Sequence, residues 1–107
     1  MKIATNIPTT IWYEIIEFLK TSGWDIVTTY EQFDKGIDFD LYEFKKEEES
    51  ILCAWDNWFE GEIKGEERFL KTLEKEFQIT FKYDTPKHLG IDILEKLKSI
   101  LPKKNKA

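Results

Sequence analysis

Residues 51–65 read ILCAWDNWFEGEIKG, and this stretch predicts the β-hairpin at the centre of the fold. ILCAW, residues 51–55, is apolar throughout, which is typical of a strand buried on both faces. Asp56 and Asn57 tolerate left-handed backbone conformations, so they form the expected tight turn. Charged residues then alternate with apolar residues or glycine through 59–64, as in a strand with one face in water.

The rest of the chain divides between helical and extended patterns around this hairpin. Apolar residues recur every three to four positions in some segments and alternate with polar residues in others. The expected helices are 8–22, 66–77 and 86 to about 101, and the other expected strands are 24–33, 37–44 and 78–83. This order, α-β-β-β-β-α-β-α, predicts an α+β fold with an antiparallel sheet of about four to five strands and helices packed mainly on one face.

The length of the chain predicts a single domain, 1–107. One domain accommodates 107 residues, and residues 102–107 form a basic tail that we expect to fray. No apolar run approaches the about 20 residues needed to span a bilayer, and the N-terminus lacks the apolar core of a secretory signal. Because a single cysteine forms no internal disulfide, we expect a cytoplasmic protein that does not enter a membrane.

Acidic residues are concentrated just before the hairpin. Residues 31–49 contain eight acids and three lysines, and the whole chain carries a formal net charge of −5. Within this segment Asp38, Asp40 and Tyr42 alternate with apolar residues, so we expect them on the wet face of one strand. Such a surface repels nucleic acid and attracts basic proteins, although plain solubility is the alternative explanation.

The residues that catalysis or metal binding needs are sparse in this chain. Cys53 and His88, the only cysteine and the only histidine, are the one candidate nucleophile–base pair. Cys53 lies in an apolar strand, however, and no third, orienting residue is recognisable. An oxygen-ligand metal site at Asp38 and Asp40 lacks the glycine and the loop of a calcium-binding motif. We therefore expect no enzyme activity, no metal and no cofactor.

Protein recognition is the remaining function class. We expect Trp55 to pack in the core, whereas Trp58, which follows the turn, could belong to the core or to a binding surface. An aromatic side chain on an acidic rim is typical of a protein interface. The candidate partner-binding residues are Asp34, Asp38, Asp40, Tyr42, Glu43, Trp58, Glu60 and Glu62.

The run WDNWFEGEIKGEERFLKTLEKEF resembles a segment of small bacterial immunity proteins, which neutralise polymorphic toxins that include those of contact-dependent growth inhibition. The resemblance covers residues 51–77, about a quarter of the chain. It implies a cytoplasmic protein that occupies a cognate toxin domain, often a nuclease with a basic cleft, and it carries over no catalytic residues. A small cytosolic adaptor or regulatory domain is the alternative, and the oligomeric state is open.

Overall fold

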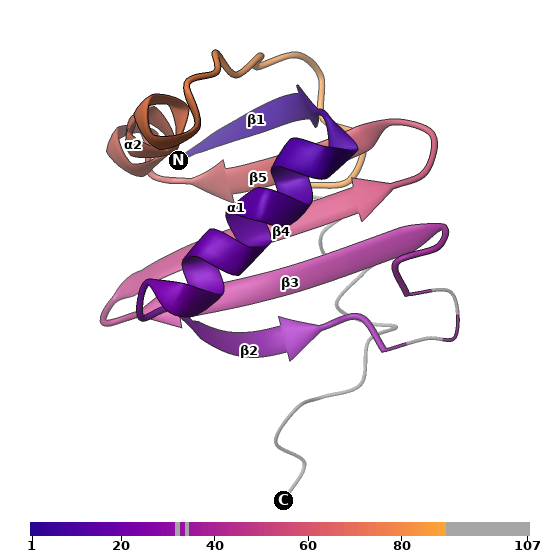
Figure 1. The fold of residues 1–107 in the computed structure, drawn as a ribbon, viewed down its shortest axis with the longest axis horizontal. Helices are drawn as coiled ribbons and strands as arrows, with labels where there is room; N and C mark the ends of the chain where they lie inside the picture. The colour runs from indigo at the N-terminus through magenta and orange to yellow at the C-terminus, as the bar shows by residue number, and fades with distance from the viewer. Residues whose placement is uncertain (32, 34, 90–107) are drawn as a thin grey trace, which may run out of the picture.

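The computed structural model of the chain describes residues 1–31, 33 and 35–89. Its elements are β1 (Lys2–Ile7), α1 (Thr9–Thr21), β2 (Asp25–Thr29), β3 (Phe39–Lys46), β4 (Glu49–Asp56), β5 (Glu60–Gly65) and α2 (Glu67–Phe77). The five strands form one antiparallel sheet with the spatial order β1-β5-β4-β3-β2 (Figure 1). The predicted α+β class with an antiparallel sheet is therefore confirmed.

The predicted element order is wrong at the N-terminus, because the chain begins with a strand. Strand β1 pairs with β5, but the register shifts between Ala4 and Ile7, where Asn6 takes a left-handed φ of 56°. This bulge interrupts the two-residue alternation that would have marked the segment as a strand. The observed order is β-α-β-β-β-β-α.

The predicted order is also wrong after α2, because the expected strand at 78–83 does not form. The chain here follows the outer edge of β1 and makes a single bridge to it, between Thr5 and Lys82. The Phe81 N–H donates to the Glu74 carboxylate at 2.7 Å, so a side chain takes the place of a strand partner. The helix expected from residue 86 does not begin there, because residues 86–89 are described and are not helical. The rest of that expected helix and the tail at 102–107 lie outside the described residues.

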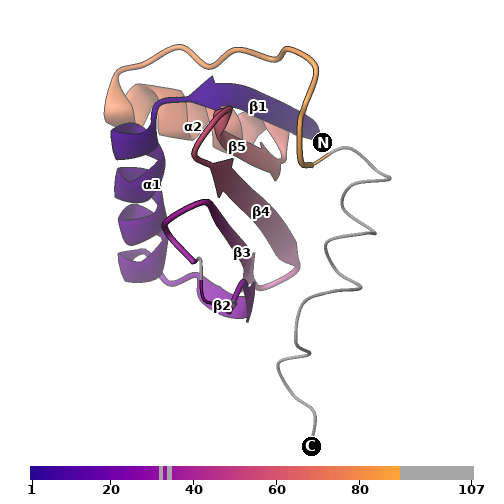
Figure 2. The same cartoon turned by 90° about the vertical axis from the view of Figure 1, so that its right-hand side faces the viewer.

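The core lies between the sheet and α1, which crosses it diagonally from the β1 edge toward the β2 edge (Figures 1 and 2). Trp12 is fully buried and donates its indole N–H to the Glu62 carbonyl at 3.2 Å. The ring packs so closely on β5 that a Cβ atom at Gly61 would lie 2.3 Å from its Cδ1 atom. Glycine at this position therefore lets the helix approach the sheet.

A second apolar cluster covers the opposite face of the sheet. Leu41 and Ala54 are buried there together with Tyr30 and Leu89. Residues 78–89 reach this face by passing over the β1 edge from the helical side (Figure 2). The helices α1 and α2 therefore pack on one face of the sheet, and Leu89 of this C-terminal segment packs on the other. Neither of these two described helices is long and apolar enough to cross a membrane.

The substitution Gly61→Ala tests the close approach of α1 to the sheet. The added methyl group clashes with Trp12, so we expect the free energy of unfolding to fall by about 1–3 kcal/mol or more. Gly65→Ala in the same strand is the matched control, because its Cβ would lie 3.6 Å from Ile51 in ordinary contact. Urea unfolding followed by tryptophan fluorescence measures both variants. Equal stability of the two would contradict this packing.

Candidate functional site

Four large apolar side chains are exposed at one end of the sheet, and we call this surface the aromatic end. They are Phe33, 96% exposed, and Ile37, 64% exposed, on the β2–β3 connection, with Trp58, 69% exposed, and Phe59, 51% exposed, on the β4–β5 turn. Both connections lie at the same end of the sheet, where α1 also begins (Figure 1). Exposed aromatic side chains of this kind mark interaction sites on soluble domains.

A backbone hydrogen bond joins the two connections of the aromatic end. The N–H of Asn57 donates to the carbonyl of Asp38 at 3.1 Å. Within the β2–β3 connection, the N–H of Gly36 donates to the Phe39 carbonyl at 2.9 Å, and Gly36 takes a left-handed φ of 75°. The exposed side chains are thus carried by two turns that are fixed to each other.

The β4–β5 turn lies one residue later than the sequence predicts. Strand β4 includes Asp56, and residues 57–59 form the turn. Asp56 is buried, and its Oδ1 atom accepts the N–H groups of Trp58, at 2.8 Å, and of Phe59. Trp58 therefore lies in the turn itself, where it is exposed, and the choice between core and surface is settled in favour of the surface. Trp55, as predicted, is buried beneath α1.

Glu60 borders the aromatic end on the side of α1. It is exposed, and its carboxylate accepts the N–H of Thr9 at the start of that helix at 3.2 Å. Its φ of 63° is unusual for a residue with a side chain and costs on the order of 1–2 kcal/mol. A pocket of about 420 Å³ opens beside it, between the end of β1 and residues 79–82.

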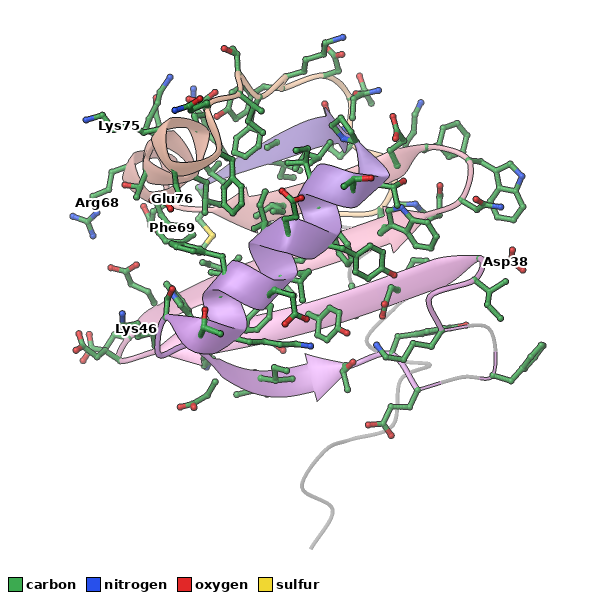
Figure 3. The ribbon with its side chains drawn as sticks, in the orientation of Figure 1. Asp38, Lys46, Arg68, Phe69, Lys75 and Glu76 are labelled. Atoms are coloured by element: carbon green, nitrogen blue, oxygen red, sulfur yellow. The ribbon has the colours of Figure 1, made fainter. Side chains whose placement is uncertain are left out.

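The acidic segment 31–49 does not form one surface. Asp38 lies at the aromatic end, whereas Lys46 lies at the opposite end of the sheet (Figure 3). Glu49, beside the β3–β4 turn, pairs there with Arg68 at 3.2 Å. The acids of this segment therefore lie at both ends of β3. Among the described residues, Asp38 and Glu60 are the predicted site acids that border the aromatic end.

Asp40 and Tyr42 do not lie on a wet face, and this expectation is wrong. Both are buried beneath α1, because Tyr13 of that helix donates to Asp40 at 3.0 Å and Trp12 packs near Tyr42. Lys35 pairs with Asp40 at 2.5 Å and lies over the Tyr42 ring, with its Nζ atom 4.2 Å from the ring centroid.

Two groups around Asp40 have shifted pKa values. Burial, with the neighbouring charge of Asp40 and the hydrogen bond to it, raises the pKa of Tyr13 well above its ordinary value, so its hydroxyl stays protonated. Burial alone would lower the pKa of Lys35, but hydrogen bonds and charge interactions with Asp40 and Tyr42 raise it overall. The Lys35 ammonium group therefore remains charged at neutral pH.

The other predicted site residues have mixed outcomes. Glu62 is buried, and its carboxylate accepts the N–H groups of Lys87, His88 and Leu89, so its expected exposure is wrong. Glu43 is half-buried and accepts the Thr28 hydroxyl at 2.8 Å. Asp34 lies outside the described residues.

Cys53 and His88 cannot act together, because they lie on opposite faces of the sheet. Cys53 packs beneath α1, where burial raises the pKa of its thiol far above the ordinary value. The His88 Nε2 atom contacts the Asp56 carboxylate on the other face. Within residues 1–31, 33 and 35–89, no three His, Cys, Asp or Glu side chains gather as a metal site would require.

Sequence reasoning missed the exposed pair Phe33 and Ile37 and the contact between His88 and Asp56. Gly36 was the available signal for the first, because a glycine turn delays the start of β3 to Phe39 and leaves Ile37 outside the strand. No local pattern signals the second contact, which joins residues 32 positions apart.

Comparison with models of known protein families, with curated proteins and with solved structures gives no match.

Asp40 and Asp38 should respond differently to replacement by asparagine. Asp40→Asn removes the charge that holds Lys35 and Tyr13, so we expect a loss of about 1.5–3 kcal/mol in the free energy of unfolding. Asp38→Asn, in the turn, should change it by about 0.5 kcal/mol or less, as at ordinary surface positions. Chemical denaturation of both variants measures the difference. An equal loss of stability in the two variants would mean that the contacts of Asp40 with Lys35 and Tyr13 do not stabilise the fold.

The thiol of Cys53 should be inert in the folded protein. Its side chain is fully buried and its raised pKa disfavours the reactive thiolate, so we expect no reaction with a chromogenic disulfide reagent at pH 8. Addition of denaturant should release one thiol per chain within seconds to minutes. Rapid reaction without denaturant would show that β4 opens beneath α1 under native conditions.

Proposed function

We propose that this chain is an immunity-type protein that binds a cognate bacterial toxin domain through the aromatic end and neutralises it. The observation that carries the proposal is the exposure of Trp58 and Phe59 on a turn fixed by hydrogen bonds. Tryptophan is among the residues that contribute most to protein interfaces when they become buried on binding. The turn also belongs to the segment that resembles immunity proteins.

The acids beside the aromatic end favour a basic partner. Asp38 and Glu60 border the exposed aromatic residues, and Glu31 is exposed on the same connection as Phe33. Opposite charge on a partner would speed association and favour the correct orientation. A nuclease toxin fits this requirement, because a cleft that holds nucleic acid must be basic. In this proposal the protein acts by occupying the toxin and not by catalysing a reaction.

The proposal predicts that a toxin domain is encoded beside this protein, and the test is whether the chain neutralises that domain. Co-expression of the wild-type chain should restore the growth of cells that produce the toxin, and the purified proteins should form a complex. The double substitution Trp58→Ala and Phe59→Ala should weaken the complex about 30-fold or more, which corresponds to about 2 kcal/mol. Because both side chains are more than half exposed, the melting temperature should change little.

Tyr83→Ala is the matched control, because it removes a partly exposed aromatic ring that lies outside the aromatic end. It should bind and protect like the wild type. Asp38→Asn should slow association and reduce its dependence on salt. If the double variant neutralises the toxin normally, the aromatic end is not the interface. If the chain binds a different cytosolic protein and gives no protection, the adaptor alternative replaces the immunity proposal.

A further inference from the structure

The turn that carries Trp58 and Phe59 is held from inside the molecule by Asp56. One carboxylate oxygen of Asp56, Oδ1, accepts the backbone N–H groups of both turn residues. The other oxygen, Oδ2, contacts Nε2 of His88. The Asp56 side chain is only 7% exposed, so water cannot readily replace these contacts. The position of the Asp56 carboxylate, and therefore the conformation of the turn, depends on the His88 imidazole.

His88 is itself held in place through its backbone. The N–H groups of His88 and Leu89 both donate to Oε1 of Glu62 at 3.0 Å, and the N–H of Lys87 donates to Oε2. Three successive backbone donors on one buried carboxylate fix the path of this segment across β5. The imidazole ring also meets Phe39 edge-on, with 5.5 Å between ring centroids.

The same segment contacts the turn directly. The Lys87 ammonium group lies over the Phe59 ring, 5.2 Å from its centroid. His88 has only 16% of its side chain exposed, so it lies behind the turn and offers little surface to a partner. Residues 87–89 thus form a backing for the turn, and Glu62 fixes that backing to the sheet.

We propose that His88 is a positioning residue for partner binding: through Asp56 it holds the turn in the conformation that presents Trp58 and Phe59. The inference rests on the function proposed above. An imidazole protonated at Nε2 donates a hydrogen bond to Asp56, and an imidazolium adds charge attraction, so either form can hold the carboxylate. His88 acts through Asp56 and makes no contact with the partner.

The experiment compares His88→Ala with His88→Gln in the full chain. Alanine removes the donor, whereas the glutamine amide places an N–H donor close to the position of Nε2. Amide hydrogen exchange at Trp58 and Phe59, followed by NMR, reports on the turn without any partner. We expect exchange at these two amides to be about tenfold faster in the alanine variant, as for loss of one hydrogen bond, and close to wild type in the glutamine variant.

Affinity for the toxin domain should follow the same pattern, with about tenfold weaker binding for alanine and recovery with glutamine. Exchange at the paired strand residues Cys53 and Ile63 is the internal control and should not change, because β4 and β5 remain paired. If His88→Ala does not fold, His88→Asn replaces it, since its shorter amide does not reach Asp56.

The outcomes separate this inference from the proposed function. Unchanged exchange at Trp58 and Phe59 in the alanine variant would overturn the positioning role of His88. Equal effects of alanine and glutamine would overturn it as well, because the donor would then be irrelevant. If replacing His88 leaves affinity intact while the Trp58 and Phe59 double variant loses binding, the inference fails and the interface stands. If neither change affects binding, the interface itself is wrong.

Discussion

The packing of Trp12 on Gly61 is the constraint on which the rest of the fold depends. It brings α1 against the central hairpin and so determines which face of the sheet is covered by helix. The same contact brings the start of α1 to Glu60, whose carboxylate accepts the Thr9 N–H, while the Thr9 hydroxyl accepts the indole N–H of Trp55 at 2.9 Å. The residue before Gly61, Glu60, takes a left-handed φ of 63° although it carries a side chain.

Buried acids connect the irregular segments to the sheet. Asp40 holds Lys35 of the β2–β3 connection, Asp56 holds the β4–β5 turn, and Glu62 holds residues 87–89. Burying a carboxylate is unfavourable unless it gains hydrogen-bond donors or an opposite charge, and each of these three has them. Among the described residues, no buried side-chain nitrogen or oxygen lacks a partner. Some of the acidic residues therefore form contacts inside the molecule and do not contribute to an acidic surface.

The sequence predicts the helices and strands of this fold better than it predicts which of their faces are buried. The helices at 9–21 and 67–77 and the central hairpin follow from period and turn chemistry, and Trp55 is buried as expected. In β3, a two-residue alternation says which residues share a face but not which face is covered. Since α1 covers the face of Asp40 and Tyr42, and Leu89 lies on the other, the polar residues of this strand could not be assigned to water from the pattern alone.

The candidate site was predictable to a similar degree. Trp58 is exposed in the turn and Glu60 directly after it, where the sequence suggested a binding edge, and Asp38 lies at the same end of the sheet. The turn lies one residue later than predicted because the buried Asp56 carboxylate accepts the N–H groups of the residues that follow it. The sequence pattern does not show that Asp56 is buried. The role of Glu62 depends on a segment 25 to 27 residues away in the sequence, and no local pattern shows such a contact.

The two ends of the sheet differ in a way that folding alone does not require. At the β3–β4 end, Arg68 and Glu49 form a pair that is 80% and 42% exposed, the kind of surface contact that contributes about 1 kcal/mol or less. At the β4–β5 end, a buried aspartate, a histidine and a glutamate hold a turn whose most prominent residues, Trp58 and Phe59, are exposed. An ordinary hairpin turn needs only small polar residues and no internal support of this kind. These buried contacts fix two side chains that add little to the core. What they determine is therefore the shape of the surface that Trp58 and Phe59 form.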